Sequence, residues 1–161
     1  MHACPCGYFG NSSRECSCSV GDIKRYRKKV SGPLLDRMDI NVHVPRLEYS
    51  DATNIALTES SLAIRQRVAV ARKIQYARLS KYNIFCNAHM DHKHIKSACH
   101  MTTGAQAILE QAFSKMNLSA RGDDRILKVV RTIADLDGAQ QLTEMHIAEA
   151  VHFRNNMQEV Y

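Results

Sequence analysis

The chain lacks several features that would place it at once in a familiar class. None of its 161 residues is tryptophan, only 6% are aromatic, and only 3 are proline. No run of about 18 apolar residues occurs, so the sequence predicts no segment that spans a membrane. Residues 1–10 contain no apolar stretch of the kind that secretory signals carry. These absences favour a location in the cytoplasm.

The motifs of several enzyme classes are also missing. The sequence has no GxxxxGK[ST] phosphate-binding loop and no strand that ends in paired acids able to hold Mg²⁺. It has no Ser/His/Asp or Cys/His arrangement at a familiar spacing. We therefore expect no complete catalytic centre within this chain.

Positive charge exceeds negative charge. With 22 Lys and Arg against 16 Asp and Glu, the net charge is +6. This balance favours an anionic partner such as nucleic acid or a nucleotide. The apolar fraction of 45% is sufficient for a hydrophobic core in one domain or slightly more.

Two close pairs of cysteines stand near the N-terminus, Cys4 with Cys6 and Cys16 with Cys18, joined by a turn-rich loop. Six cysteines in a chain with no visible export signal indicate reduced thiols or metal ligands rather than disulfides. Two such pairs can converge as four thiolates around one tetrahedral Zn²⁺. The alternative is four free thiols on an ordinary loop. We predict the zinc site, because a small loop without an apolar core has little else to hold it.

A second group of potential metal ligands lies in a polar interval at residues 86–100. It contains His89, His92, His94, Cys99 and His100. No pair among them has the rigid spacing of a helical zinc motif such as HExxH, so we favour a polar loop that happens to be rich in histidine. Cys86 and Cys99 are expected in the core.

A fixed corner is predicted at Ser31–Pro45. Ser-Gly-Pro ends any helix that arrives from upstream, and an alternating run follows as a short strand, with one face made of Ile40, Val42 and Val44. Arg37 stands between these features, flanked by Asp36 and Asp39. An arginine held in this way can present its guanidinium to a phosphate or a carboxylate. The residues alone favour the simpler interpretation, an ion pair with one of the flanking acids.

The remaining pattern is helical. Ser19 is expected to cap a basic helix to about Val30, whose cations could contact phosphates or form a solvated face. After a linker at Arg46–Leu57, Thr58 or Ser60 caps a long helix to about Tyr82. The predicted inward residues of this helix are Ile64, Val68, Ala71 and Ile74, with Val70 and Ala77 beside them.

Three further helices complete the expected bundle. The first spans about Thr103–Met116. The second runs from a cap at Ser119 to about Leu136, where an Asp-Gly pair ends it. The third runs from a cap at Thr143 to about Arg154. In the second of these, Ile126, Val129, Val130 and Ile133 point inward at helical spacing. We therefore predict a mainly α fold, in which the C-terminal two thirds is an antiparallel helical bundle.

Three blocks of sequence resemble one family. They are ACPCGYFGNSSRECSCS, SGPLLDRMDINVHVP and LSARGDDRILKVVRTIADLDG. Together with the segments between them, they resemble the C-terminal part of the magnesium-chelatase-like AAA+ ATPases of the ComM (YifB) group. The resemblance implies that residues 1–48 are the end of an ATPase core, with its zinc knuckle, and that residues 49–161 are an α-helical lid.

The family resemblance also implies a function. The ComM group forms homo-oligomeric rings that bind ATP and Mg²⁺ and act as DNA helicases, promoting branch migration during natural transformation. Arg37 matches the arginine of the family's GPLLDR block and would be the finger that reaches the neighbouring subunit's ATP. Arg121 matches the arginine of LSAR and would be the sensor for its own subunit's nucleotide, with Arg125 also near the cofactor and Arg131 competing for the role.

The resemblance sets limits as well. The family's Walker loop and acidic strand are absent from this sequence, so we expect the chain alone to be inactive. Where the family usually has Asn-Pro, this chain has His2 and Ala3, which leaves the asparagine's role unassigned. The alternative function is a stand-alone zinc-containing module that binds nucleic acid without catalysis. A purely structural adaptor is a third possibility.

Overall fold

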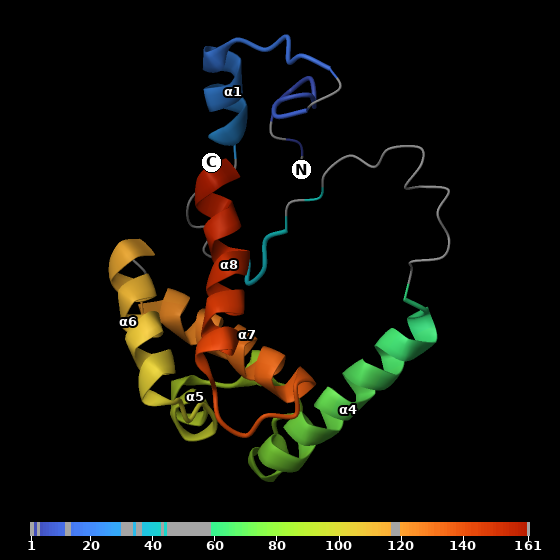
Figure 1. Ribbon diagram of the computed structural model, residues 1–161, viewed down its shortest axis with the longest axis vertical. Coiled ribbons are helices and arrows are strands. Elements are labelled where there is room, and N and C mark those ends of the chain that lie inside the picture. The colour runs from blue at the N-terminus through green and yellow to red at the C-terminus, as the bar shows by residue number, and fades with distance from the viewer. Residues whose placement is uncertain are drawn as a thin grey trace. The chain divides into compact units, whose positions relative to one another are not determined.

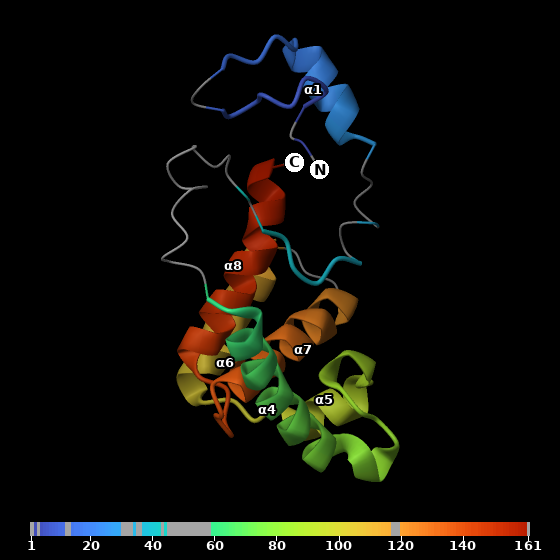
Figure 2. The same cartoon turned by 90° about the vertical axis from the view of Figure 1, so that its right-hand side faces the viewer.

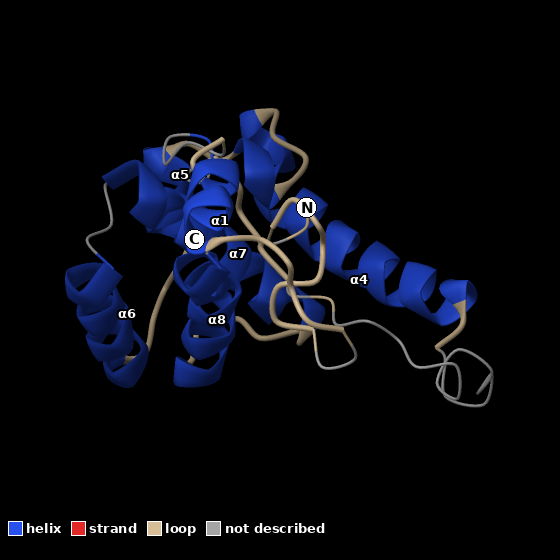
Figure 3. Cartoon of the chain, turned by 90° about the horizontal axis from the view of Figure 1, so that it is seen from above, coloured by secondary structure: helices blue, strands red, loops and turns tan. Residues whose placement is uncertain are grey.

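The computed structural model describes residues 2, 4–11, 14–29, 34, 37–42, 44, 59–116 and 120–160. For residues 120, 121 and 155–160 it describes the backbone only. The chain divides into two compact units, one made of Met1–Asn54 with Arg154–Tyr161 and the other of Ile55–Phe153. The fold is mainly α, as predicted, and the described residues contain helices joined by loops (Figure 3).

Helix α1 (Val20–Arg27) is the regular element of the first unit. Ser19 caps it as predicted, because its Oγ accepts a hydrogen bond from the backbone N–H of Asp22 at 3.2 Å. Ile23 is the buried residue of this helix. Lys24 and Arg25 of this helix are exposed, as are Lys28 and Lys29 just after it.

The short strand predicted after the Arg37 corner does not form in the described residues 40–42 and 44. They have no regular secondary structure. The side chains of Ile40, Val42 and Val44 are 53%, 58% and 80% exposed. A strand needs a neighbour to complete its hydrogen bonds, and period-two spacing alone does not provide one.

The second unit is built around helix α7 (Ala120–Leu136). The other helices are α4 (Ser61–Leu79), α5 (His92–Ala98), α6 (Thr103–Met116) and the part of α8 (Glu144–Val160) that precedes Arg154, with short 3₁₀ turns η2 (Ser80–Tyr82) and η3 (Asn87–His89). Helices α4 and α5 and turn η3 contact α7 directly. Figures 1 and 2 show α7 lying among these elements and α6. Among the described residues, no helix combines the length and hydropathy that a membrane span requires.

The predicted inward face of α7 is confirmed. Ile126, Val129 and Val130 are buried and Ile133 is partly buried against the same core. Residues of α6 and α8 complete that core, among them Ala105, Leu109, Ile147 and Ala150. Ser119, the predicted cap of α7, lies outside the described residues.

The predicted inward face of α4 is confirmed at Ala71 but was wrong for four other residues. Ile64, Val68 and Val70 are 42%, 46% and 58% exposed, and Ala77 is exposed too. The buried residues of α4 are Ala71, Gln75 and Leu79. Helical spacing identifies an apolar face, but the neighbouring elements decide how much of it is covered, and here only the second half is covered.

The sequence interval expected to be an irregular polar loop contains α5. Asp91 caps this short helix by accepting a hydrogen bond from the backbone N–H of His94 at 2.9 Å. Ile95 and Ala98 anchor the helix in the core. The prediction missed α5 because about two turns of helix carry too few apolar residues to show a period.

A buried carboxylate joins three parts of the second unit. Asp135 of α7 has a fully buried side chain. It accepts two hydrogen bonds from Arg78 of α4, at 2.8 and 2.6 Å. It also accepts one from Asn87 of η3 at 2.8 Å and one from Arg131, one turn earlier on α7, at 3.1 Å. The network therefore ties α4 and the segment after it to α7.

Two loops of this unit are joined through their backbones. Met101 and Leu142 form an isolated parallel bridge, and the backbone N–H of Leu142 donates to the carbonyl of His100 at 2.8 Å. Buried His146 accepts from the backbone N–H of Thr143 at its Nδ1, at 3.1 Å. Its Nε2, which then carries the proton, donates to Asp137 at 3.2 Å. These contacts fix the turn between α7 and α8.

We predict that Asp135→Ala will lower the free energy of unfolding of this unit by about 3–5 kcal/mol. The substitution leaves the buried guanidinium of Arg131 without its carboxylate, and uncompensated buried charge is strongly destabilising. Urea denaturation followed by far-UV circular dichroism measures the change.

The matched control is Glu59→Ala. Glu59 pairs with Arg67 through two short contacts of 2.7 and 3.0 Å, yet both side chains are largely exposed. Its loss should cost less than about 1 kcal/mol. Equal losses in the two variants would contradict the central role of Asp135.

Candidate functional site

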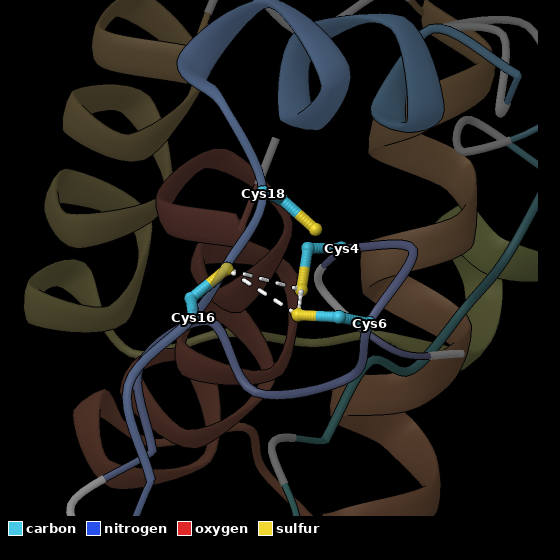
Figure 4. Close-up of side chains that lie close together, drawn as sticks. All are labelled: Cys4, Cys6, Cys16 and Cys18. Atoms are coloured by element: carbon cyan, nitrogen blue, oxygen red, sulfur yellow. Dashed lines mark hydrogen bonds between the residues drawn. The ribbon is translucent and has the colours of Figure 1, made fainter.

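The four N-terminal cysteines converge in the first unit, as their spacing predicted. The Sγ atoms of Cys4, Cys6, Cys16 and Cys18 all lie within 4.8 Å of one another. The Sγ of Cys6 is 3.4 Å from that of Cys4 and 3.5 Å from that of Cys16, and Cys16 is 3.6 Å from Cys4. Figure 4 shows the four side chains turned toward a common centre.

Two glycine turns shape the first arm of this cluster. The backbone N–H of Gly7 donates to the carbonyl of Cys4 at 3.2 Å, and Gly7 has a φ of 82°. Gly10 has a φ of 78°. Such positive angles are easily adopted only by glycine. The resulting turn brings Cys4 and Cys6 to the same side of the loop.

Backbone N–H groups point at the sulfur atoms. That of Phe9 donates to the Sγ of Cys4 at 3.3 Å. The backbone of Tyr8 makes a hydrogen bond with Cys6, which is the main reason that the pKa of this thiol is lowered to about 6. These bonds stabilise a negatively charged sulfur at Cys6, whereas burial and the neighbouring thiols of the cluster raise the pKa of Cys16 to about 12 and also raise the pKa of Cys18. A thiolate, rather than a thiol, is the form that binds a metal.

The cluster fits one tetrahedral ion. With metal–sulfur bonds of about 2.3 Å, the sulfurs of a tetrahedral four-thiolate site lie about 3.8 Å apart. The three separations among Cys4, Cys6 and Cys16, 3.4–3.6 Å, are close to this value, the Sγ of Cys18 lies within 4.8 Å of the others, and all four cysteines are free of disulfides. Four thiolates leave no open position for a substrate. The arrangement is therefore suited to holding a structure together rather than to catalysis.

Aromatic and basic residues brace the cysteine loop. The guanidinium of Arg14 lies 4.4 Å from the ring centre of Tyr8 and donates to its hydroxyl at 3.1 Å. Arg27 of α1 lies 4.9 Å from the ring centre of Phe9. The second contact connects the loop to the helix that follows it. Sequence analysis missed both pairs, since no periodic pattern places these residues together.

The Arg37 corner also lies in the first unit. Arg37 is exposed and sits in a turn, where its backbone N–H donates to the carbonyl of Leu34 at 3.0 Å. The carbonyl of the next residue, Met38, accepts from the Nη1 of Arg154 at 3.4 Å. Asp36, one of the two acids expected to pair with Arg37, lies outside the described residues.

The other predicted nucleotide contacts lie in the second unit. Arg121 is in the first turn of α7, and its side chain lies outside the described residues. Arg125, one turn later, is half-buried. Arg131 is 1% exposed. Its guanidinium is occupied by Asp135 and by the carbonyls of Ala139 and Gln140, which gives it a structural role.

The histidines at positions 89, 92 and 94 each contact a different partner. Nδ1 of His92 lies 2.8 Å from Asp124, and Nδ1 of His94 lies 2.6 Å from Asp91. Cys99 is buried as predicted, and burial raises its pKa to about 11. Cys86 is only half-buried, which differs from the prediction, and its Sγ lies 3.5 Å from Nδ1 of His89.

Comparison with known proteins identifies the family. Residues 58–154 match the family described as "Magnesium chelatase, subunit ChlI C-terminal", and residues 1–52 match "Magnesium chelatase, subunit ChlI". The chain belongs to the magnesium chelatase subunit ChlI C-terminal family, as its sequence blocks indicated.

Curated relatives extend this result. The chain is 37% identical over 155 residues to competence protein ComM of Haemophilus influenzae, covering 96% of this chain and 29% of that protein. It is 35% identical over 156 residues to YifB of Escherichia coli, with the same shares of each. The chain thus spans about three tenths of the length of the relatives it matches.

We predict that protein prepared without chelators will carry about one metal ion per chain, and that a single thiol will then react quickly with a disulfide reagent. That thiol is Cys86, because four cysteines are held by the ion and Cys99 is buried with a raised pKa. Elemental analysis and thiol titration measure both quantities.

A chelator should raise the number of fast-reacting thiols to about five. The variant Cys86→Ser should show none before chelation and keep its metal, whereas Cys6→Ser should lose it. A folded chain that contains no metal and exposes all the N-terminal thiols would refute the site.

Proposed function

We propose that this chain is part of a ring-forming AAA+ ATPase that acts on DNA as a helicase or branch-migration factor. The observation that carries the proposal is the family match along almost the whole chain, with the ChlI region followed by its C-terminal region. Similarity to competence protein ComM supports a role in transformation. In this proposal residues 1–48 belong to the ATPase core and residues 49–161 form its helical lid.

Arg37 is proposed as the arginine finger. A guanidinium at an exposed turn whose backbone is hydrogen-bonded can be presented to a neighbouring subunit. There it would stabilise the charge that develops on a transferring phosphoryl group, as arginine fingers do. The role requires a homo-oligomer, because this arginine would act on the ATP of the next subunit.

Arg121 is proposed as the lid sensor, with Arg125 beside it. Arg121 opens α7, and the start of a helix favours phosphate because its first N–H groups have no partners within the helix. Arg131, which the sequence left as a competitor, is removed from this role by its buried contacts. ATP and Mg²⁺ would be held mainly by parts of the longer protein, so the chain alone is not expected to hydrolyse ATP.

We further propose that the metal held by the four cysteines is zinc. Four thiolates at tetrahedral spacing match the soft donors and the geometry that Zn²⁺ accepts. The ion would stabilise a loop whose described residues include only one buried cysteine and few other core contacts. Its role is structural.

The exposed cations of α1 beside the cysteine cluster favour one alternative. A zinc module with basic residues could bind nucleic acid without any catalysis. If ATP turnover by the longer protein depends on residues of this chain, then nucleic-acid binding without catalysis cannot be the complete function.

We predict that Arg37→Ala in the longer protein will lower the ATP turnover rate by a factor of about 10³ or more while nucleotide still binds. A coupled assay measures turnover, and a fluorescent nucleotide measures binding. Arg25→Ala provides the control, because Arg25 is an exposed arginine of the same unit. Normal turnover in the Arg37 variant would refute the finger assignment.

Mixed rings sharpen this experiment. If Arg37 acts on a neighbouring subunit, Arg37→Ala subunits should regain part of their turnover when mixed with subunits that cannot bind nucleotide but keep Arg37. Two defective partners would then complement each other within one ring. A residue that acts within its own subunit would give no recovery.

Arg121→Ala should lower turnover by about 10²-fold and show no recovery in the same mixed rings, since a sensor acts on its own subunit's nucleotide. Circular dichroism should confirm that α7 remains folded. Recovery by mixing would show instead that Arg121 acts across the subunit boundary.

A further inference from the structure

The second unit has a shallow, open cleft beside the second half of α4. Its volume is about 590 Å³, and it is lined by Arg72, Lys73, Tyr76, Phe85, Cys86 and His89. The first three come from α4 and the others from the segment that follows η2. None of these residues takes part in the proposed metal site or in the proposed nucleotide contacts.

Two aromatic rings form the apolar wall of this cleft. The rings of Tyr76 and Phe85 are stacked, with centroids 6.0 Å apart and an angle of 16° between their planes. Both side chains remain more than half exposed, at 57% and 52%. A protein with few aromatic residues and no tryptophan thus leaves two of them stacked in solvent. Such a pair offers a planar apolar surface to a ligand.

The buried network holds this pair in place. Asn87, two residues after Phe85, is 2% exposed and donates to Asp135 at 2.8 Å and to Thr132 at 3.0 Å. Its backbone N–H donates to Gln75, the neighbour of Tyr76 on α4, at 3.3 Å. The two segments that carry the rings are therefore fixed to each other. A surface already in its binding arrangement loses little freedom when a ligand arrives.

The cations beside the rings lack acidic partners. Helix α4 contains no aspartate or glutamate. Two of its arginines are paired, Arg67 with Glu59 and Arg78 with Asp135. Arg72 and Lys73 are exposed and make no ion pair with any residue that the structure describes. Positive charge next to a stacking surface complements a ligand that is both planar and anionic.

We propose that this cleft binds single-stranded nucleic acid, with an unpaired base stacked on the Tyr76–Phe85 pair and the flanking phosphates on Arg72 and Lys73. Stacking on aromatic side chains and salt-dependent phosphate contacts are the two features of such binding. The class of partner rests on the proposed action on DNA, while the position of the site rests on the cleft itself. An acidic peptide would satisfy the cations but not the ring surface.

The experiment measures the affinity of the 161-residue chain for a fluorescent oligothymidylate of about 8 nucleotides by anisotropy. The matched probe is an abasic strand with the same number of phosphates. We expect the chain to bind the thymidine strand about ten-fold more tightly than the abasic strand. Tyr76→Ala and Phe85→Ala should each remove most of that preference, without changing the dependence on salt.

The double variant Arg72→Gln/Lys73→Gln tests the phosphate contacts separately. Each lost phosphate contact lowers the slope of log affinity against log salt by about 0.7, so the double variant should lower it by about 1.4. The preference for bases over abasic sites should remain. The two classes of variant thus give opposite patterns in the same assay.

Controls come from the same unit. Tyr82→Ala removes another exposed aromatic residue, which contacts His94 and does not line the cleft. Lys93→Gln/Lys96→Gln removes two exposed cations of α5. The Tyr82 variant should keep the base preference. The lysine variant should lower the salt slope by less than the Arg72 and Lys73 variant does.

Three results would overturn the proposal. They are the absence of binding to the oligothymidylate, equal affinity for the abasic strand, and full base preference in the Tyr76 and Phe85 variants. None of these results depends on ATP turnover. The proposed function is tested separately, by the effect of Arg37→Ala on that turnover. A ring ATPase that is active and stimulated by DNA even with Tyr76→Ala and Phe85→Ala combined would show that the proposed function stands and the cleft is not the site.

Discussion

The second unit depends on one buried carboxylate. Asp135 is fully buried and accepts hydrogen bonds from Arg78, Asn87 and Arg131, which come from three different elements. In an apolar interior a carboxylate is tolerated only when its oxygens are fully hydrogen-bonded. This requirement allows few arrangements of α4, η3 and α7, so the network selects one packing from those that the apolar core alone would permit.

The same network links the core to the surface. Asn87 is held by Asp135 on one side and by Gln75 on the other, and the rings of Tyr76 and Phe85 extend from those two segments into solvent. The positions of the residues that line the cleft therefore follow from the hydrogen bonds made by the buried polar groups. A surface supported in this way remains organised without a ligand.

The first unit uses a different constraint. Its described residues bury little apolar surface, with Ile23 and Cys4 as the buried apolar residues. Four sulfur atoms at tetrahedral spacing, backbone N–H groups directed at them, and two arginine–ring contacts take the place of a core. A metal ion bound there would supply the stability that hydrophobic burial supplies in the second unit.

The sequence by itself determined the helices other than α5, the cap of α1 at Ser19, the inward face of α7 and the four-cysteine group, because these follow from local spacing and from side chains that act on nearby backbone. It also identified the family through blocks that run along the chain. Only the tertiary structure decided which half of α4 is covered, that residues 40–42 and 44 form no strand, and that Arg131 is structural. It alone showed that Tyr76 and Phe85 stack at the surface. Each of these depends on contacts between residues far apart in the chain, and periodicity carries no information about such partners.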